Sequence, residues 1–202
     1  MGGGGTDRVG VAGGPAGGPR GTLVGVSGLE QRWNLNIHYH RCVLDAVPDG
    51  ARTALDVGCG DGLLSFDLAD RGLDVVGLDT DTDSVARAQA DSRASGRTRF
   101  VTGDLFSYQF EPASFDVVAS IAMLHHVDAA TGLRRMAELV RPGGVVAVVG
   151  FARPVTVLDH SRAIAGSMFK RYRKARRQYW EHRAPTLWPP PLTSSEMREV
   201  AQ

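Results

Sequence analysis

Short apolar runs and amphipathic stretches follow one another along residues 52–151. Apolar runs such as VVGL at 75–78 and VVAVVGF at 145–151 are typical of strands buried on both faces of a sheet. The predicted strands are 53–57, 74–78, 99–101, 115–120 and 144–151. The predicted helices are 32–47, 62–70, 83–95 and 129–140. This alternation predicts an α/β fold, doubly wound around a mostly parallel Rossmann-like sheet.

The first 28 residues differ in composition from the rest of the chain. They hold twelve of the 25 glycines. Gly raises the entropy cost of ordering a segment, and the few valines here bury little surface in return. The segment lacks the basic start and apolar stretch of a secretory signal. We expect residues 1–28 to be a disordered Gly-rich tail that precedes a core at 29–152.

Residues 153–183 are strongly basic, with nine basic and two acidic residues, although the whole chain has a net charge of +1. Within them, 162–180 predicts a helix with one apolar stripe and basic flanks. The stripe consists of Met168, Tyr172, Ala175 and Tyr179. One interpretation is a helix whose apolar stripe packs on the core and whose basic face is solvated. The alternative is a basic surface that binds an anionic substrate, a membrane or RNA.

A Pro-rich stretch follows the basic helix, and Thr193 and Glu196 then have the spacing of a helical capping box. The sequence ends a few residues into that helix, and so short a helix is marginal alone. We therefore expect 153–202 to be a basic helix and a cap segment that is cut short.

The bulk composition narrows the class of protein. Hydrophobic residues make up 43% of the 202 residues, enough for a buried core. Cys42 and Cys59 lie in unrelated contexts, which argues against a disulfide-dense secreted scaffold and a multi-cysteine metal site. We expect a cytoplasmic protein without a metal centre or a DNA partner, since the near-neutral charge favours no polyanion.

The strongest chemical signal is DVGCGDG at 56–62, between a predicted strand and a predicted helix. Glycines at alternate positions allow a tight turn and a close approach of the backbone to a ligand. The turn lacks the Lys of a P-loop, and Leu63 stands where the dinucleotide fingerprint has its last glycine. Asp56 would repel a pyrophosphate, whereas it suits a cation such as S-adenosylmethionine (SAM).

Acidic residues also follow two later strands. Asp79 closes the second strand, where a carboxylate can accept both ribose hydroxyls of an adenosine or cap a helix. Asp81 and Asp83 fit caps of the next helix better than a ligand site. Asp104 follows the third strand, where it can accept the amine of adenine or close a local turn.

The chain resembles the class I SAM-dependent methyltransferase family over residues 52–151, above all its small-molecule branch. Five segments carry the resemblance, in family order and spacing: LDVGCGDG, VVGLDTD, TGDLF, FDVVASIAMLHHV and LVRPGGVVAVVGF. The resemblance implies a cofactor site around the methionine end, the ribose, the adenine and the sulfonium of SAM. The implied residues are, in that order, Asp56, Gly58, Cys59 and Gly60; Asp79 and Thr80; Asp104 and Leu105; Ser120 and Ile121.

Two groups of residues are candidates for the acceptor side. His126 follows the fourth strand and can serve as a general base, with His125 near the substrate; the alternative is packing of their loop. Trp33 and Tyr39 lie ahead of the core, where related enzymes place a covering helix. That helix, with His38 and His40, is either a lid that touches substrate or a helix packed on the sheet.

The chain departs from the family at its end. The family sheet closes with an antiparallel pair of strands, which the sequence does not show, so we expect an exposed edge beside the fifth strand. The expected function is SAM-dependent methyl transfer to a small molecule. The alternative is an RNA-directed methyltransferase, or a non-catalytic SAM-binding or adaptor protein that uses the basic helix.

Overall fold

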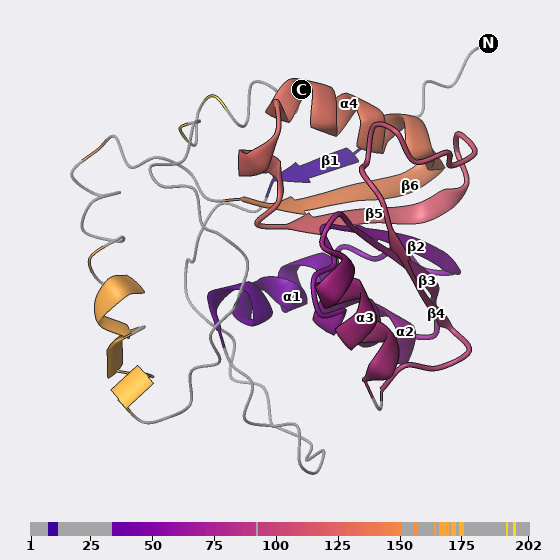
Figure 1. Ribbon diagram of the computed structural model, residues 1–202. Coiled ribbons are helices and arrows are strands. Elements are labelled where there is room, and N and C mark those ends of the chain that lie inside the picture. The colour runs from indigo at the N-terminus through magenta and orange to yellow at the C-terminus, as the bar shows by residue number, and fades with distance from the viewer. Residues whose placement is uncertain are drawn as a thin grey trace.

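The computed structural model describes residues 8–11, 34–91 and 93–150, and isolated positions between 156 and 196. A six-stranded parallel sheet forms its centre, in the order β1-β6-β5-β2-β3-β4 (Figure 1). The strands are β1 (Arg8–Val11), β2 (Thr53–Val57), β3 (Asp74–Asp79), β4 (Thr98–Thr102), β5 (Phe115–Ile121) and β6 (Val140–Val149). The helices are α1 (Leu35–Asp45), α2 (Leu63–Asp70), α3 (Thr82–Ala90), the 3-10 turn η1 (Leu124–His126) and α4 (Ala129–Leu139).

The predicted doubly wound α/β fold is confirmed. α1 and α2 pack on one face of the sheet, where Leu68 and Val43 meet Ala54 and Val117. α3 joins α2 on the same side through a small cluster that includes Phe66 and Phe100. α4 covers the other face with Met136 and Leu139 (Figure 1). Both faces of β2 and β5 are therefore buried, which accounts for their nearly continuous apolar sequences.

The sheet reverses its winding direction between β2 and β5. The chain moves from β2 outward through β3 and β4, then returns to place β5 on the other side of β2. The ends of β2 and β5 are neighbours, with Asp56 opposite Ala119. Ligands of open α/β sheets bind at the carboxyl ends of the strands at such a switch point.

The prediction of disorder throughout residues 1–28 is wrong for Arg8–Val11. These residues form β1, which runs parallel to β6 with Arg8 opposite Val145 and Val11 opposite Val148. Figure 1 shows the indigo β1 beside the orange β6, strands from opposite ends of the chain. The edge of β6 presents backbone N–H and C=O groups that β1 pairs. The expectation of an exposed edge next to this strand is therefore also wrong.

Several predicted boundaries shift for local reasons. α1 begins three residues later than predicted, because the Asn34 side chain caps it by accepting a hydrogen bond from the Ile37 N–H (2.9 Å). α3 ends at Ala90 rather than 95. β6 begins at Val140 rather than 144, with a register irregularity opposite Phe115 and Val117.

Most of residues 153–202 lie outside the described residues, so the domain boundary at 152/153 stays a prediction. Described positions from 164 to 175 are helical, and both Met168 and Tyr172 are exposed there. The predicted capping box is present: the Thr193 N–H donates to Glu196 and the Glu196 N–H donates to the Thr193 hydroxyl. Across the described part of the chain, the helices are too short or too polar to cross a lipid bilayer.

Candidate functional site

The glycine turn joins β2 to α2 at the switch point. The N–H groups of Gly58 and Cys59 both donate to the Leu78 carbonyl on β3, at 2.8 and 3.1 Å. Gly58 and Gly62 have φ values of +74° and +78°, a region that L side chains rarely adopt. A Cβ at Gly62 would lie 2.7 Å from the Phe100 ring. The turn thus requires glycine for both its conformation and its close packing.

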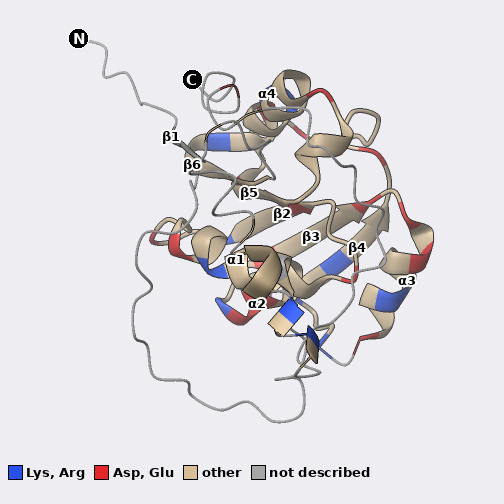
Figure 2. Cartoon of the chain, turned by 90° about the vertical axis from the view of Figure 1, so that its left-hand side faces the viewer, with Lys and Arg blue, Asp and Glu red and all other residues tan. Residues whose placement is uncertain are grey.

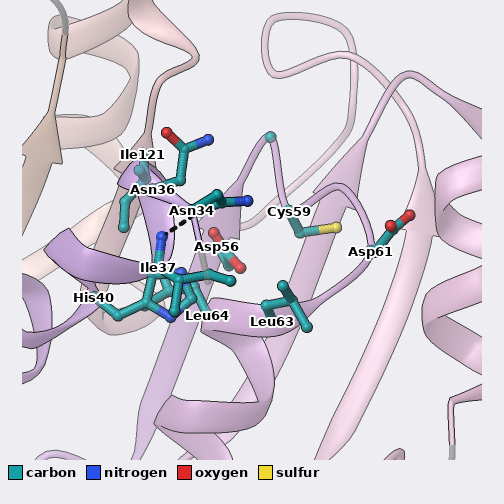
Figure 3. Close-up of a pocket in the computed structure, with 11 residues that line it drawn as sticks. Asn34, Asn36, Ile37, His40, Asp56, Cys59, Asp61, Leu63, Leu64 and Ile121 are labelled. Carbon is teal, nitrogen blue, oxygen red and sulfur yellow. Dashed lines mark hydrogen bonds between the residues drawn. The ribbon is translucent and has the colours of Figure 1, made fainter. Parts of the chain in front are cut away.

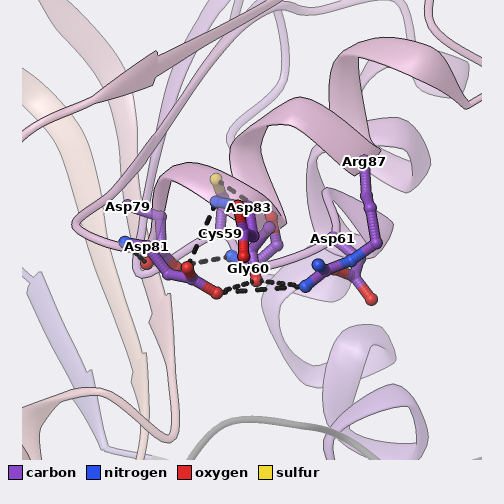
Figure 4. Close-up of polar contacts among 8 residues, drawn as sticks. Cys59, Gly60, Asp61, Asp79, Asp81, Asp83 and Arg87 are labelled. Carbon is purple, nitrogen blue, oxygen red and sulfur yellow. Dashed lines mark hydrogen bonds and ion pairs between the residues drawn. The ribbon is translucent and has the colours of Figure 1, made fainter.

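The Asp79 carboxylate lies against this turn, as Figure 4 shows. One of its oxygens accepts the Gly60 N–H at 2.7 Å, and the other accepts the Asp81 N–H at 2.9 Å. Asp81 in turn caps α3, as the sequence predicts, by accepting the Asp83 N–H (3.2 Å). Thr80 is exposed beside it. Asp79 therefore holds both the glycine turn and the residues that lead into α3.

An ion pair closes the outer side of the turn. Arg87 on α3 donates from Nε to the Asp61 carboxylate at 2.9 Å (Figure 4). Arg87 also reaches the Ser84 hydroxyl at 2.7 Å. The charge of Arg87 is thus paired with Asp61 on the outer side of the turn. Arg87 does not line the pocket described next.

Asp56 is buried at the end of β2, with 2% of its surface exposed. Its carboxylate accepts a hydrogen bond from the Ser65 hydroxyl at 2.7 Å. Burial raises the pKa of Asp56 to about 6, against the opposing effects of the Ser65 hydrogen bond and of His40 nearby. Burial, together with Asp56 and Asp79, also raises the pKa of the Cys59 thiol, which keeps Cys59 neutral.

A small pocket lies between α1 and the glycine turn (Figure 3). Its volume is about 40 Å³. One wall comes from the start of α1, through Asn34, Asn36, Ile37 and His40. The other wall comes from the turn, the start of α2 and the end of β5, through Asp56, Gly58, Cys59, Asp61, Leu63, Leu64 and Ile121. The predicted covering helix thus lies over the turn.

His40, which the sequence analysis places on the covering helix without assigning it to the site, lines the pocket. It is 6% exposed, and its Nδ1 lies 2.6 Å from the Asp67 carboxylate on α2. Arg93 binds the other oxygen of Asp67 at 3.2 Å. Asn36, Ile37 and His40 are spaced as one helix face, which is the signal that identifies them. Tyr39 instead contacts His38 and is absent from the pocket lining, and Trp33 lies outside the described residues.

The other predicted residues lie farther along the same edge. The Asp104 carboxylate closes its own turn by accepting the Phe106 N–H at 2.9 Å. Leu105 is buried in the core on the α4 face. Ser120 is fully buried, and its hydroxyl has no hydrogen-bond partner within the described part of the chain. Ile121 reaches the pocket.

The two histidines are in η1, with ring centroids 4.1 Å apart. Burial, followed by the neighbouring His126, lowers the pKa of His125, while His126 itself is exposed. Neither histidine lines the pocket. The structure therefore brings the glycine turn, Asp56 and Ile121 together, and leaves both histidines outside that group.

Known methyltransferases are similar to this chain in sequence and in fold. The model of the Methyltransferase domain family matches residues 55–148. An uncharacterised methyltransferase of Mycobacterium tuberculosis is 41% identical over 174 residues, which cover 84% of this chain and 86% of that protein. The chain belongs to the class I SAM-dependent methyltransferases. This confirms the family that the five sequence segments resemble.

Two further methyltransferases are similar over part of their length. The ubiquinone biosynthesis O-methyltransferase of Leptothrix cholodnii is 39% identical over 102 residues, which cover 48% of this chain and 43% of that enzyme. The phosphoethanolamine N-methyltransferase 2 of Haemonchus contortus, solved with phosphomonomethylethanolamine and S-adenosylhomocysteine, is 25% identical with a TM-score of 0.56. That match covers 81% of this methyltransferase and 35% of the Haemonchus chain.

SAM is the cofactor of the methyltransferase, and the chemistry of the pocket fits it. The residues that line the pocket offer carboxylates and side-chain amides, and they include no Lys or Arg that would favour a phosphate. The buried Asp56 suits the ammonium at the amino-acid end of SAM. Gly58 lines this pocket with its backbone, and the Met123 side chain occupies the space that a Cβ at Gly58 would take.

Proposed function

We propose that this methyltransferase transfers the methyl group of SAM to a small-molecule acceptor that enters beneath α1. The covered glycine turn carries the proposal: α1 and the turn form opposite walls of one pocket, lined by Asn36 and His40 on one side and by Asp56 and Gly58 on the other (Figure 3). An acceptor must reach the switch point past this helix, which favours a small molecule over the surface of a macromolecule. In the view of Figure 2, acidic and basic residues are interspersed over the described core rather than gathered by sign.

The similar enzymes support a small acceptor. One takes its name from ubiquinone biosynthesis, and the other is solved with phosphomonomethylethanolamine. The two names differ in the compound that they mention, and a shared fold does not determine the substrate. We favour a phenolic or related ring acceptor, because the L. cholodnii enzyme is the more similar of these two by sequence identity.

We assign the cofactor residues as the family resemblance implies them. Asp56 receives the ammonium group, Gly58, Cys59 and Gly60 supply backbone against the methionine end, and Asp79 with Thr80 receives the ribose. Asp104 and Leu105 contact the adenine, and Ser120 and Ile121 flank the sulfonium. The contact of Asp79 with Gly60 supports the assignment of both residues to one site, because the carboxylate fixes the turn that we assign to the methionine end.

SAM supplies an activated methyl carbon with a good leaving group, so the protein's main contribution is to position the acceptor. An acceptor hydroxyl must also lose a proton. We propose His126 for this step, because its ring is exposed and follows β5. His125, whose lowered pKa keeps it neutral, would orient the substrate beside it. Trp33 and Tyr39 stay candidates for substrate contact from α1 and the residues before it.

We also propose that the enzyme works in a reducing cytoplasm. Cys42 and Cys59 are both free thiols, Cys42 exposed and Cys59 buried. An exposed thiol persists most readily in a compartment that keeps cysteines reduced. A basic surface for RNA or a membrane at 162–180 stays an untested alternative, since that segment lies largely outside the described residues.

The decisive experiment measures S-adenosylhomocysteine release from SAM with a panel of phenols, hydroquinones, amines and carboxylic acids. We expect turnover with at least one ring hydroxyl acceptor, and a His126→Ala variant that loses turnover most at neutral pH and least at high pH, where the acceptor hydroxyl ionises without a base. The His38→Ala variant is the matched control, because His38 is an exposed histidine of α1. Turnover of an RNA oligonucleotide but of no small molecule would contradict the proposal.

A further inference from the structure

The two strand ends at the switch point carry unusual backbone conformations that face each other. Gly58 follows β2 with φ +74°, and Ala122 follows β5 with φ +58°. Within the described residues, the other non-glycine with positive φ is Ala113, at +51°. An L residue in this region costs about 1 kcal/mol. Strain of this kind is concentrated at functional sites.

Neighbouring contacts hold Ala122 in this conformation. Its N–H donates to the Val149 carbonyl at the end of β6, at 2.7 Å. The turn then directs the chain into η1, where the His126 N–H donates to the Met123 carbonyl at 2.9 Å. The left-handed residue thus sets the direction of Met123 between two anchored points.

The side chain of Met123 packs on the glycine turn. A Cβ built at Gly58 would lie 2.9 Å from both Cβ and Cγ of Met123, so the methionine side chain occupies the space over the Gly58 backbone. Met123 also packs against the apolar core on the α4 face. A glycine with no side chain of its own has few contacts to hold its peptide in place. Met123 supplies such a contact from the opposite strand end.

We infer that Met123 is a positioning residue for the methyl donor: set by the left-handed turn at Ala122, its side chain fixes the Gly58 backbone in the conformation that receives the methionine end of SAM. The inference rests on the proposed function of the glycine turn. Met123 acts through Gly58, which lines the pocket, whereas Met123 itself is outside the lining. A flexible thioether suits this role because it adapts to small shifts of the backbone on which it packs.

The test is calorimetric titration of full-length protein with S-adenosylhomocysteine, at a temperature where every variant is folded. We expect Met123→Ala to weaken binding by fivefold or more and Met123→Leu to stay within twofold of wild type. Leu133→Ala is the control for lost packing, because Leu133 is also partly buried against the same core cluster. It should lower the melting temperature as Met123→Ala does and leave the dissociation constant unchanged.

A second pair of variants isolates the backbone turn. Ala122→Gly removes the strain and frees the direction of Met123, so we expect weaker binding without loss of stability. Ala113→Gly makes the same change in an exposed loop and should bind as the wild type does. The inference is overturned if Met123→Ala binds as tightly as Leu133→Ala, or Ala122→Gly as tightly as Ala113→Gly. Failure of the wild type to bind at all would instead overturn the proposed function.

Discussion

The two halves of the sheet that meet at the switch point are built in different ways. At the ends of β2 and β3, carboxylates organise the backbone: Asp56 accepts from Ser65, and Asp79 accepts from Gly60 and Asp81. At the end of β5, a fully buried Ser120 hydroxyl lacks a described partner and Ala122 is strained. The first half is a polar frame, whereas the second is shaped by packing; in our proposal the first receives most of the cofactor and the second faces the acceptor.

The largest effect that we predict tests whether the cofactor half depends on backbone fit. Gly62→Ala puts a Cβ 2.7 Å from the buried Phe100 ring, in a left-handed conformation. We expect the conformation and the overpacking together to lower the free energy of unfolding by about 3 kcal/mol. Urea denaturation measures this change.

Gly50→Ala is the matched control for that variant. Gly50 has φ +80° with no atom within 4 Å of a built Cβ, so this variant carries the conformational cost of about 1 kcal/mol alone. Equal losses for both variants would show that close packing under the turn contributes nothing. The polar contacts of Asp56 and Asp79 would then account for the cofactor half without close packing.

The sequence predicts the local parts of the molecule better than the parts that depend on long-range contacts. The glycine turn, Asp79 and the cap at Asp81 are local or follow strand ends, so spacing along the chain identifies them. The pairing of β1 with β6 joins residues more than a hundred positions apart, and a Gly-rich segment carries no local signal for it. The left-handed conformation of Ala122 cannot be predicted from the sequence either, because alanine has no preference for that conformation.

The contact between His40 and Asp67 can be predicted from the sequence only in part. The two residues are 27 positions apart on different helices, so no motif links them. The helical spacing of Asn36, Ile37 and His40 predicts a shared face, but it does not show which face meets the turn. That orientation depends on how α1 packs on α2 and the sheet.

A smaller effect tests whether the polar frame binds the cofactor. We expect Asp79→Ala to weaken S-adenosylhomocysteine binding by tenfold or more, about 1.4 kcal/mol, because it leaves the ribose hydroxyls and the Gly60 N–H without their acceptor. Isothermal titration calorimetry gives the dissociation constant. Asp74→Ala, at the exposed opposite end of β3 where Asp74 pairs with Arg97, is the control. An unchanged constant for Asp79→Ala would remove this residue from the site.

The smallest predicted effect is a pH dependence that comes from Asp56. The pKa of Asp56 is about 6 in the folded state and 3.8 ordinarily. Between these pH values the folded state keeps a proton that the unfolded state has already released. The Asp56 contribution to stability is therefore present below about pH 4 and is lost as pH rises through about 6. Binding should change in the opposite direction, because the ammonium of the ligand prefers the ionised carboxylate.

Titration at pH 5 and pH 7 separates these two effects. We expect S-adenosylhomocysteine to bind about fivefold more weakly at pH 5, where most of Asp56 is protonated. The melting temperature of the ligand-free Asp56→Asn variant should lack the pH dependence that Asp56 gives to the wild type. Asp56→Asn should also bind with little change between the two pH values. 5′-Methylthioadenosine, which lacks the amino-acid end, should show the same weak pH dependence with the wild type. If it instead follows S-adenosylhomocysteine, the pH effect belongs to another group, and Asp56 supports the turn without receiving the ammonium.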